Sequence, residues 1–348
     1  MSGIATRTPV LGTSGFLSTK VQAVYDRNLL LRVTPNEVFD RFGQAKVIPA
    51  KSNAKKGFAY RYKNILPATT PIAEYSGSNI KAPNKIVREE VEFAVNHYGD
   101  YIVYTDELDL YDFDTVNSSF LNVLGDQASI TLDTIRRDAL RGGTNVIFAD
   151  GATDRDTVAT GGKLITASDL KLATVKLKNQ RAKKFKKVIT GSTKIATTPI
   201  RAGYVGVTSP EVIEDLRNLA GWKDVENYAD YSKAMPDEIG SWGDIRFIES
   251  YNNDPVDPTG AGAGTNVYLT LVLGEDAYAT TSVRGKGGIM TKVKPLGSAG
   301  AEDPLDQYGT IGWKAIAGCA ILNEAFLVRL ESVASIEDAN AKHYYDYS

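Results

Sequence analysis

Cysteine and histidine are scarce in this sequence. Among 348 residues there is one cysteine, Cys319, and there are two histidines, His97 and His343. A single cysteine cannot form an intrachain disulfide, which argues against selection for an oxidising compartment. Structural zinc sites need clusters of cysteine and histidine, which one cysteine and two distant histidines cannot supply. We therefore expect no disulfide framework and no zinc site, in a protein made in a cytoplasm.

Long apolar runs and an excess of either charge are also missing. No uncharged apolar segment approaches the roughly 20 residues of a membrane span, and the N-terminal residues lack the apolar core of a signal peptide. The 40 basic and 42 acidic side chains give a net charge of -2, whereas a dedicated nucleic-acid-binding protein is clearly basic. Hydrophobic residues make up 43% of the chain, enough for one large domain or two moderate ones. We expect a soluble protein without a membrane partner.

Motifs for catalysis and ligand binding are incomplete. His97 has acidic residues nearby, but the sequence contains no GxSxG nucleophile motif, so we interpret this histidine as structural. The segment Gly260–Gly264 lacks the third glycine of a dinucleotide fingerprint, and Gly285-Lys286 lacks the serine or threonine that follows in a phosphate loop. The acidic run Asp106–Asp114 lacks the glycine of a calcium loop. We predict no catalytic, cofactor-binding or metal-binding residue, and no cofactor.

The longest predicted element is a helix from Asp112 to Gly143. Apolar or small residues recur in steps of three and four, at Phe113, Val116, Phe120, Leu124, Ala128, Thr131, Ile135 and Ala139. A second apolar set lies off this stripe, at Leu121, Ile130, Leu132 and Leu140. Asp112 or Asp114 can cap the start, and Gly142-Gly143 can end the helix in a left-handed turn. Such a helix would be about 45 Å long and would need cover from more than one side. We therefore expect part of it to be exposed in a single chain.

A long two-stranded excursion precedes this helix. Residues 58–62 alternate aromatic side chains with small or basic ones, and residues 86–95 alternate again on the return. Prolines and glycines between residues 64 and 83 favour a turn at the tip. A hairpin of this length has too little core to be stable alone in water, so we expect it to lie on a neighbouring chain.

The other predicted elements mix helices and strands without a regular βαβ repeat, which favours an α+β fold. They are a short helix at 35–43, strands at 99–105, 145–149, 204–207, 245–248 and 267–273, a helix capped by Thr166 or Ser168, a helix starting at Ser209-Pro210, and a strand-like stretch at 315–330.

Charge is distributed unevenly along the chain. Residues 89–114 contain nine acidic residues and no lysine or arginine, whereas residues 170–210 contain ten basic residues, from Lys171 to Arg201, and no acid. A solvated basic face is the first interpretation of the basic stretch. The second is complementarity between the two segments across a subunit boundary, and the third is contact with DNA phosphates. Under the second interpretation, reversing three lysines among residues 183–187 impairs self-assembly.

Several stretches together resemble one protein family. They are residues 24–44 (VYDRNLLLRVTPNEVFDRFGQ), 99–109 (GDYIVYTDELD), 132–146 (LDTIRRDALRGGTNV), 238–250 (EIGSWGDIRFIES) and 303–332 (DPLDQYGTIGWKAIAGCAILNEAFLVRLES). In this order they resemble the major capsid proteins of tailed bacteriophages, in the branch similar to the coat protein of N4-like phages. No single stretch is a catalytic signature, so the resemblance rests on their joint occurrence across nearly the whole chain.

The resemblance implies the coat fold first described for phage Hong Kong 97. It divides the chain into an N-terminal arm (1–45), an extended loop (46–97), a peripheral domain (98–145 and 310–340) with a spine helix (112–142), an axial domain (146–309) and a C-terminal tail (341–348). Some coat proteins of this fold form a covalent crosslink between lysine and asparagine. Lys55, Lys56 and Lys63 lie in the extended-loop region, but no local motif marks them, and we expect no crosslink.

The resemblance also implies a structural role rather than an enzymatic one. Hexamers and pentamers of the chain would build an icosahedral shell that encloses double-stranded DNA without sequence specificity, in a virion assembled in the cytoplasm of a bacterial host. A scaffolding protein, a portal protein and a decoration protein are the further partners that the family implies. The alternatives are an encapsulin-like compartment of the same fold, distinguished by protein cargo, and a cytoplasmic enzyme without a recognisable motif.

Overall fold

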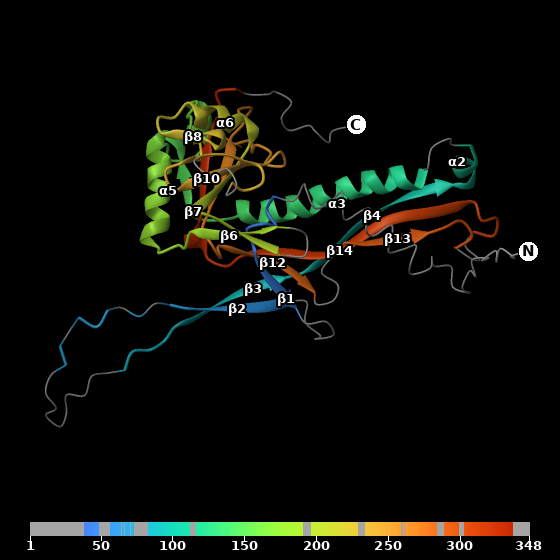
Figure 1. The fold of residues 1–348 in the computed structure, drawn as a ribbon, viewed down its shortest axis with the longest axis horizontal. Coiled ribbons are helices and arrows are strands. Elements are labelled where there is room, and N and C mark those ends of the chain that lie inside the picture. The colour runs from blue at the N-terminus through green and yellow to red at the C-terminus, as the bar shows by residue number, and fades with distance from the viewer. Residues whose placement is uncertain are drawn as a thin grey trace, which may run out of the picture.

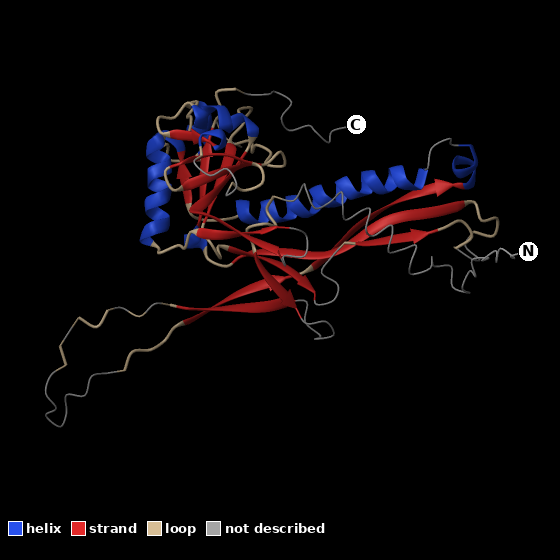
Figure 2. Ribbon diagram, viewed as in Figure 1, coloured by secondary structure: helices blue, strands red, loops and turns tan. Residues whose placement is uncertain are grey.

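Two lobes and a protruding hairpin make up the described part of the chain (Figures 1 and 2). The computed structural model describes residues 38–336, apart from 49–55, 64, 66, 70, 73–82, 112–115, 191–195, 229–233, 259, 261, 284–288 and 299–302. Its strands form a five-stranded, an eight-stranded and a two-stranded sheet, and helices cover the two larger ones. This mixture confirms the predicted α+β class.

The five-stranded sheet is built around one long strand, β14 (Tyr308–Ile321). On one side β14 pairs antiparallel with β4 (Asn96–Thr105) over ten consecutive residue pairs. On the other side it pairs with β13 (Met290–Lys294) and with β12 (Tyr278–Val283), and β1 (Gln44–Ile48) runs parallel to β12. The short helix α2 (Asp106–Tyr111) follows β4 at the far end of this lobe (Figure 1).

Helix α3 (Val116–Arg141) lies along one face of this sheet (Figure 1). Its buried row consists of Leu121, Leu124, Ala128 and Leu132, which pack in one cluster with Ile311, Trp313 and Ala315 of β14. This row combines members of both predicted apolar sets, because the sheet contacts the helix along a line between them. Val123, on the opposite side, is 61% exposed, which confirms that part of the helix is uncovered in a single chain.

The ends of α3 differ from the prediction. The proposed capping residues Asp112 and Asp114 lie outside the described residues. At the other end the helix stops at Arg141, but neither Gly142 nor Gly143 adopts a left-handed conformation. Close packing explains the glycine at position 143, because an added Cβ atom would lie 2.7 Å from a side-chain carbon of Leu327.

The eight-stranded sheet forms the second lobe. Its path runs through β5 (Val146–Phe148), β15 (Leu327–Ser332), β11 (Tyr268–Leu273), β7 (Ala196–Thr208), β10 (Ile245–Glu249), β9 (Glu238–Trp242) and β8 (Trp222–Asp224), with β6 (Phe185–Thr190) paired to β7. All six residues of β11 are buried, since both faces of the sheet are covered. One face packs against α5 (Ala167–Asn179) and α6 (Pro210–Arg217), while Leu140 of α3 packs on the other. The short helix α4 (Arg155–Thr160) and 3-10 turns at Ala149–Gly151, Val225–Asn227 and Glu324–Phe326 complete the lobe.

Local signals located the helices of this lobe correctly. Thr166 caps α5 in a capping box with Asp169, and Pro210 occupies the first turn of α6, as the sequence predicts. The predicted helix at 35–43 is wrong for its described part, because residues 38–43 form turns. The predicted apolar face is nevertheless buried, since Phe39 and Phe42 pack beneath the eight-stranded sheet.

The predicted boundary at residue 310, between the axial and peripheral domains, does not coincide with the boundary between the two sheets. β12 and β13 precede that boundary but pair with β14, whereas β15 follows it and pairs with β11 and β5. The strand-like stretch at 315–330 is therefore two strands in two different sheets, joined by the turn at Glu324–Phe326. Both strands are buried and mostly apolar, so their hydrophobic pattern contains no information about which sheet each one joins.

The contact between α3 and the sheet leads to a first prediction. Leu124→Ala should lower the free energy of unfolding of the unassembled chain by about 2–5 kcal/mol, because it leaves a cavity between α3 and β14. Val123→Ala, one residue away on the exposed side, should change it by less than about 0.5 kcal/mol. Urea unfolding followed by circular dichroism measures both, and equal effects would contradict the observed orientation of the helix.

Candidate assembly surfaces

The hairpin of β2 (Lys56–Tyr62) and β3 (Arg88–Ala94) projects away from both lobes (Figure 1). On one of its faces Phe58, Tyr60 and Tyr62 are 50%, 55% and 63% exposed. On the other face Phe93 is buried and packs with Ile48 and Ile316 of the five-stranded sheet. The hairpin is therefore anchored at its base, while three aromatic side chains in a row remain uncovered by their own chain.

Ion pairs within the hairpin neutralise its acidic residues. Lys63 and Arg61 both contact Glu89, and these hydrogen bonds hold the pKa of the Glu89 carboxyl below its usual value. On the aromatic face Lys56 pairs with Glu92 at 2.5 Å and Arg88 with Glu90 at 2.6 Å. The Arg88 guanidinium also lies 4.4 Å from the centre of the Tyr60 ring. These exposed pairs order the side chains but contribute little to stability.

The basic stretch beginning at Lys171 is also partly neutralised within the chain. Lys178 and Lys184 both bind Asp244, at the turn between β9 and β10, and their hydrogen bonds lower the pKa of this carboxyl. Lys183, Lys186 and Lys187 are exposed. The acids of β3 and two of the lysines thus have partners in their own chain, which leaves fewer charges for pairing between segments 89–114 and 171–201.

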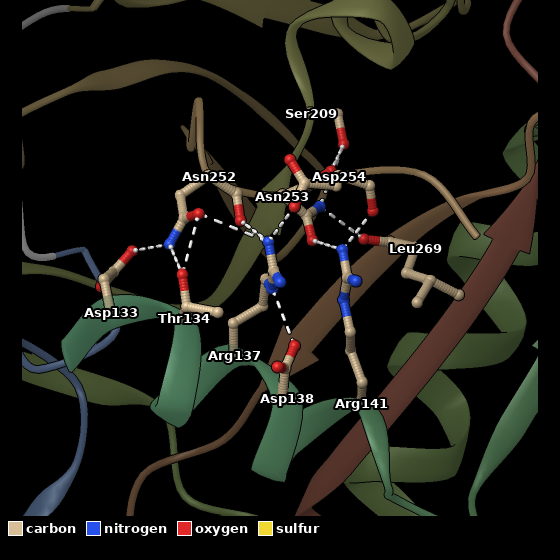
Figure 3. A network of polar contacts seen from close by, with 10 residues as sticks. All are labelled: Asp133, Thr134, Arg137, Asp138, Arg141, Ser209, Asn252, Asn253, Asp254 and Leu269. Atoms are coloured by element: carbon tan, nitrogen blue, oxygen red, sulfur yellow. Dashed lines mark hydrogen bonds and ion pairs between the residues drawn. The ribbon is translucent and has the colours of Figure 1, made fainter. Parts of the chain in front are cut away.

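A polar network joins the second half of α3 to the eight-stranded lobe (Figure 3). Arg137 donates a hydrogen bond of 2.6 Å to the carbonyl oxygen of Asn252 and pairs with the Asp254 carboxylate. Arg141 donates to the side-chain oxygen of Asn253 and to the carbonyl oxygen of Asp254. Asn253 in turn donates to the carbonyl oxygen of Leu269 in β11, 2.7 Å away. Burial and the like charge of Arg137 lower the pKa of Arg141 to about 10.

Asp133 is the buried centre of the same network. Its carboxylate accepts hydrogen bonds from the backbone N–H of Phe39 at 3.0 Å and from the side chain of Asn252 at 3.3 Å. One turn along, Arg136 pairs with Asp40 at 3.2 Å. Burial raises the pKa of Asp133, although these donors and Arg136 oppose the shift. One helix face therefore binds both the turn at residues 38–43 and the loop at 252–254.

The residues considered in the sequence as chemical candidates do not converge in the described structure. His97 lies in β4, while His343 and Gly285-Lys286 fall outside the described residues. The loop containing Gly260 packs against α4, where its backbone N–H donates to Asp156. Part of the acidic run, Asp106–Tyr111, forms α2. In the described ranges no group of three or more histidine, cysteine or acidic side chains could hold a metal ion.

The polar joint at Asn252 and Asp133 corresponds to no motif in the sequence. Asn252 and Arg137 are 115 residues apart, and neither belongs to a motif. Asp133, Arg136 and Arg137 lie three and four residues apart, so they share one helix face, and all three are buried. Charged residues on one face of a helix are the feature that points to such a joint. Among the described residues, no helix is both long enough and apolar enough to cross a membrane.

Comparison with known proteins places the chain in a family. The model of a family described as phage capsid protein matches residues 88–330. The chain belongs to this phage capsid protein family. The capsid protein is 24% identical over 274 residues to the major capsid protein of Pseudomonas phage KPP21, which covers 71% of this chain and 68% of that protein. Members of this family are structural proteins, not enzymes.

Solved phage capsids have the same fold as this capsid protein. The capsid of Ralstonia phage GP4 matches with a TM-score of 0.67 and 12% identity, over 97% of this chain and all of that one. The structure from Mycobacterium phage Che8 matches with a TM-score of 0.53 and 13% identity, over 94% of this chain and 98% of that one. These matches confirm the predicted coat fold of the Hong Kong 97 type.

The buried carboxyl of Asp133 predicts how stability changes with pH. Its pKa is raised in the folded state, so its contribution to stability is complete below the ordinary pKa of aspartate and is lost as the pH rises through the folded-state value. Asp133→Asn removes the ionisable carboxyl and therefore removes this loss of stability with rising pH. The melting temperature of the variant, compared with the wild type, should therefore increase progressively from acidic to neutral pH.

Differential scanning calorimetry of purified protein at several pH values measures this difference. Asp138→Asn removes a carboxylate that is 58% exposed and pairs with Arg137 of the same helix, and it provides the control, because loss of an exposed ion pair should change the melting temperature little at any pH. A difference between Asp133→Asn and wild type that stays constant with pH would contradict the assignment.

Proposed function

We propose that the chain is a major capsid protein, many copies of which form the hexamers and pentamers of an icosahedral shell around double-stranded DNA. Membership in the phage capsid protein family supports this proposal, together with the fold shared with solved capsids. The resemblance to the coat proteins of N4-like phages supports a place in that branch. Assembly would take place in the cytoplasm of the bacterial host.

The observation that carries the proposal is the uncovered hairpin. A two-stranded sheet is marginally stable in water, and this one exposes three aromatic side chains along one face. Burial of such side chains against a neighbour removes apolar surface from water and stabilises the hairpin in the same step. Association would therefore bury the aromatic surface that has no partner in the monomer.

The proposed parts of the subunit follow the sheets rather than the linear sequence. The peripheral domain would comprise α3 and the five-stranded sheet, including β12 and β13, and the axial domain would comprise the eight-stranded sheet, including β15. The hairpin would be the extended loop. Residues 1–37, outside the described ranges, would provide most of the N-terminal arm.

The proposed partners are other copies of the chain, other virion proteins and DNA. Copies of the chain are the main partner, and a scaffolding protein, a portal protein and a decoration protein are further ones that the family resemblance supports. Packaged DNA would contact the inner surface without sequence specificity. The small net charge of -2 agrees with a wall that has no strong general affinity for a polyanion.

Expression of the chain and negative-stain electron microscopy test the proposal directly. Closed shells or rings of hexamers and pentamers are the expected product, and a small discrete oligomer in size-exclusion chromatography would contradict it. If shells form, the cargo distinguishes the two related functions. Protein rather than nucleic acid inside native particles would favour an encapsulin-like compartment.

Shortening the hairpin should prevent shell formation without unfolding the subunit. Deletion of residues 55–84 would also remove β2, so a sharper change replaces residues 64–86 with Asn-Gly. The backbone N–H of Lys63 donates to the carbonyl of Val87, so a tight turn can close the hairpin at this point. We expect a folded, soluble chain by circular dichroism and no closed particles in micrographs. Intact shells from this variant would show that the outer hairpin is dispensable.

A further inference from the structure

A group of cations lies where α5 leads into β6. Residues 181–187 (RAKKFKK) contain five basic residues and no acidic one. The two apolar members, Ala182 and Phe185, are buried, and Phe185 packs edge-to-face with Phe42, with ring centres 5.7 Å apart. Four of the cations are exposed, namely Arg181, Lys183, Lys186 and Lys187. Two buried side chains therefore hold this segment on the eight-stranded lobe, while most of its charges are in contact with solvent.

Arg181 ends α5 in a left-handed conformation. Its backbone N–H donates to the carbonyl oxygen of Lys178 at 2.9 Å, and that of Ala182 donates to Leu177 at 3.0 Å. This pair of bonds is the Schellman motif, in which the residue at the place of Arg181 has a positive φ and is usually glycine. Arg181 has a φ of 57°, although its Cβ atom makes this conformation unfavourable. The chain thus has a cation at a position where glycine would be less strained.

The pairing of β6 with β7 is irregular just after this turn. Phe185 pairs with Gly203 and Lys187 with Pro199, so residues 200–202 of β7 lie opposite Lys186 alone. Extra residues in one strand of a ladder change the direction of side chains. Arg201, the middle residue of the three, is exposed, and its guanidinium lies 5.2 Å from the centre of the Tyr228 ring. We call the five exposed cations the basic surface: Arg181, Lys183, Lys186, Lys187 and Arg201.

Carboxylates of the same chain do not neutralise the basic surface. Asp244 already pairs with two other lysines of the stretch. Glu275 and Asp276 follow β11 close to Lys183, whose carbonyl oxygen accepts from the backbone N–H of Glu275 at 2.9 Å, but neither carboxylate forms an ion pair with this lysine. None of the five cations has an ion-pair partner among the described residues.

The rest of the chain is acidic. Ten of the 40 basic residues and none of the 42 acidic ones lie in residues 170–210, so the remainder has 30 basic and 42 acidic residues. The net charge of -2 therefore combines a positive region with an acidic remainder. Because gathered like charges repel one another, the basic surface is the part of the chain that gains most from an anionic partner.

We propose that the basic surface binds the phosphates of the packaged DNA. This inference rests on the proposed shell function and names the part of the subunit that contacts DNA. Lysine binds phosphate as a point charge, and phosphate contacts carry no sequence information. The contact would therefore be independent of DNA sequence and would weaken with salt, because binding releases counterions from the phosphates. In the shell, this side of the eight-stranded lobe would face the interior.

An acidic protein segment is the other polyanion that this surface could bind. DNA is favoured because the apolar residues among the cations, Ala182 and Phe185, are buried, and phosphate contacts need no apolar surface, whereas protein interfaces have an apolar centre. The acidic segment 89–114 of a second copy is less suited, since the three glutamates of β3 already pair within their own chain.

DNA binding by the unassembled full-length chain at several salt concentrations tests the proposal. Fluorescence anisotropy of a labelled DNA duplex gives the slope of log affinity against log salt concentration. Lys183→Gln, Lys186→Gln and Lys187→Gln combined should reduce the magnitude of this slope by about 2–3, because three phosphate contacts are lost. Binding should weaken equally for duplexes of different sequence.

The matched control is Lys292→Gln, Lys294→Gln and Lys314→Gln combined. These three lysines of the five-stranded sheet are also exposed and have no ion-pair partner among the described residues. The control should leave the slope unchanged, and circular dichroism establishes that both variants fold. An equal decrease with both variants, or none with the first, would overturn the assignment. Displacement of the duplex by poly-glutamate at the same charge concentration would also overturn it and would indicate an acidic protein partner.

Arg181→Gly separates DNA binding from a role in the fold. Glycine fits the left-handed position better, so the melting temperature should rise, while the loss of one phosphate contact should reduce the salt slope by about 1. A lower melting temperature, or an unchanged slope, would show that this arginine serves the fold and would remove it from the proposed surface.

Assembly separates this inference from the proposed function. The combined variant at residues 183, 186 and 187 should form shells as the wild type does. Failure of that variant alone to form shells would favour pairing between subunits and overturn the DNA assignment. Absence of shells from the wild-type chain would instead contradict the proposed function itself.

Discussion

The structure depends on one helix that serves two lobes by two kinds of contact. The first half of α3 packs apolar side chains onto the five-stranded sheet, and this packing excludes water. The second half places Asp133, Arg137 and Arg141 against the loop at 252–254, where directional hydrogen bonds set the geometry. Arg137 is buried, but its partner Asp254 is 42% exposed, so the ion pair itself adds little to stability. The network therefore specifies how the lobes are joined more than how stably they fold.

The second constraint is that the hairpin has much exposed surface and little core. Fourteen residues in β2 and β3 form a sheet with a single anchored end, so most of their side chains have no partner in the chain. Ion pairs on both faces of the hairpin order its charged side chains. As a monomer, a subunit with this element exposes apolar surface, which the proposed association of copies would cover. Under this proposal, stability is divided between the fold of one chain and the association of copies.

Local signals in the sequence predicted most elements but not their partners. The capping box at Thr166, the alternation along the hairpin and the apolar steps of α3 were all readable, because each depends on residues within one or two turns. The partition of residues 315–330 between two sheets was not, since β14 and β15 are both uniformly buried. The joint at Asn252 and the pairing of Lys178 with Asp244 depend on residues that are far apart in sequence. Charge counts along the chain could not show that the acids of β3 and two of the lysines have partners in their own chain.

Ion pairing within one chain has a consequence for assembly. Where lysines and glutamates already have partners, long-range attraction between copies is weak, and contacts form by shape and by the few charges left over. In this chain the exposed aromatic residues lie on the hairpin, and Lys292, Lys294 and Lys314 of the five-stranded sheet have no ion-pair partner among the described residues. Within each copy, the polar joint at the end of α3 fixes the two lobes to each other by directional hydrogen bonds.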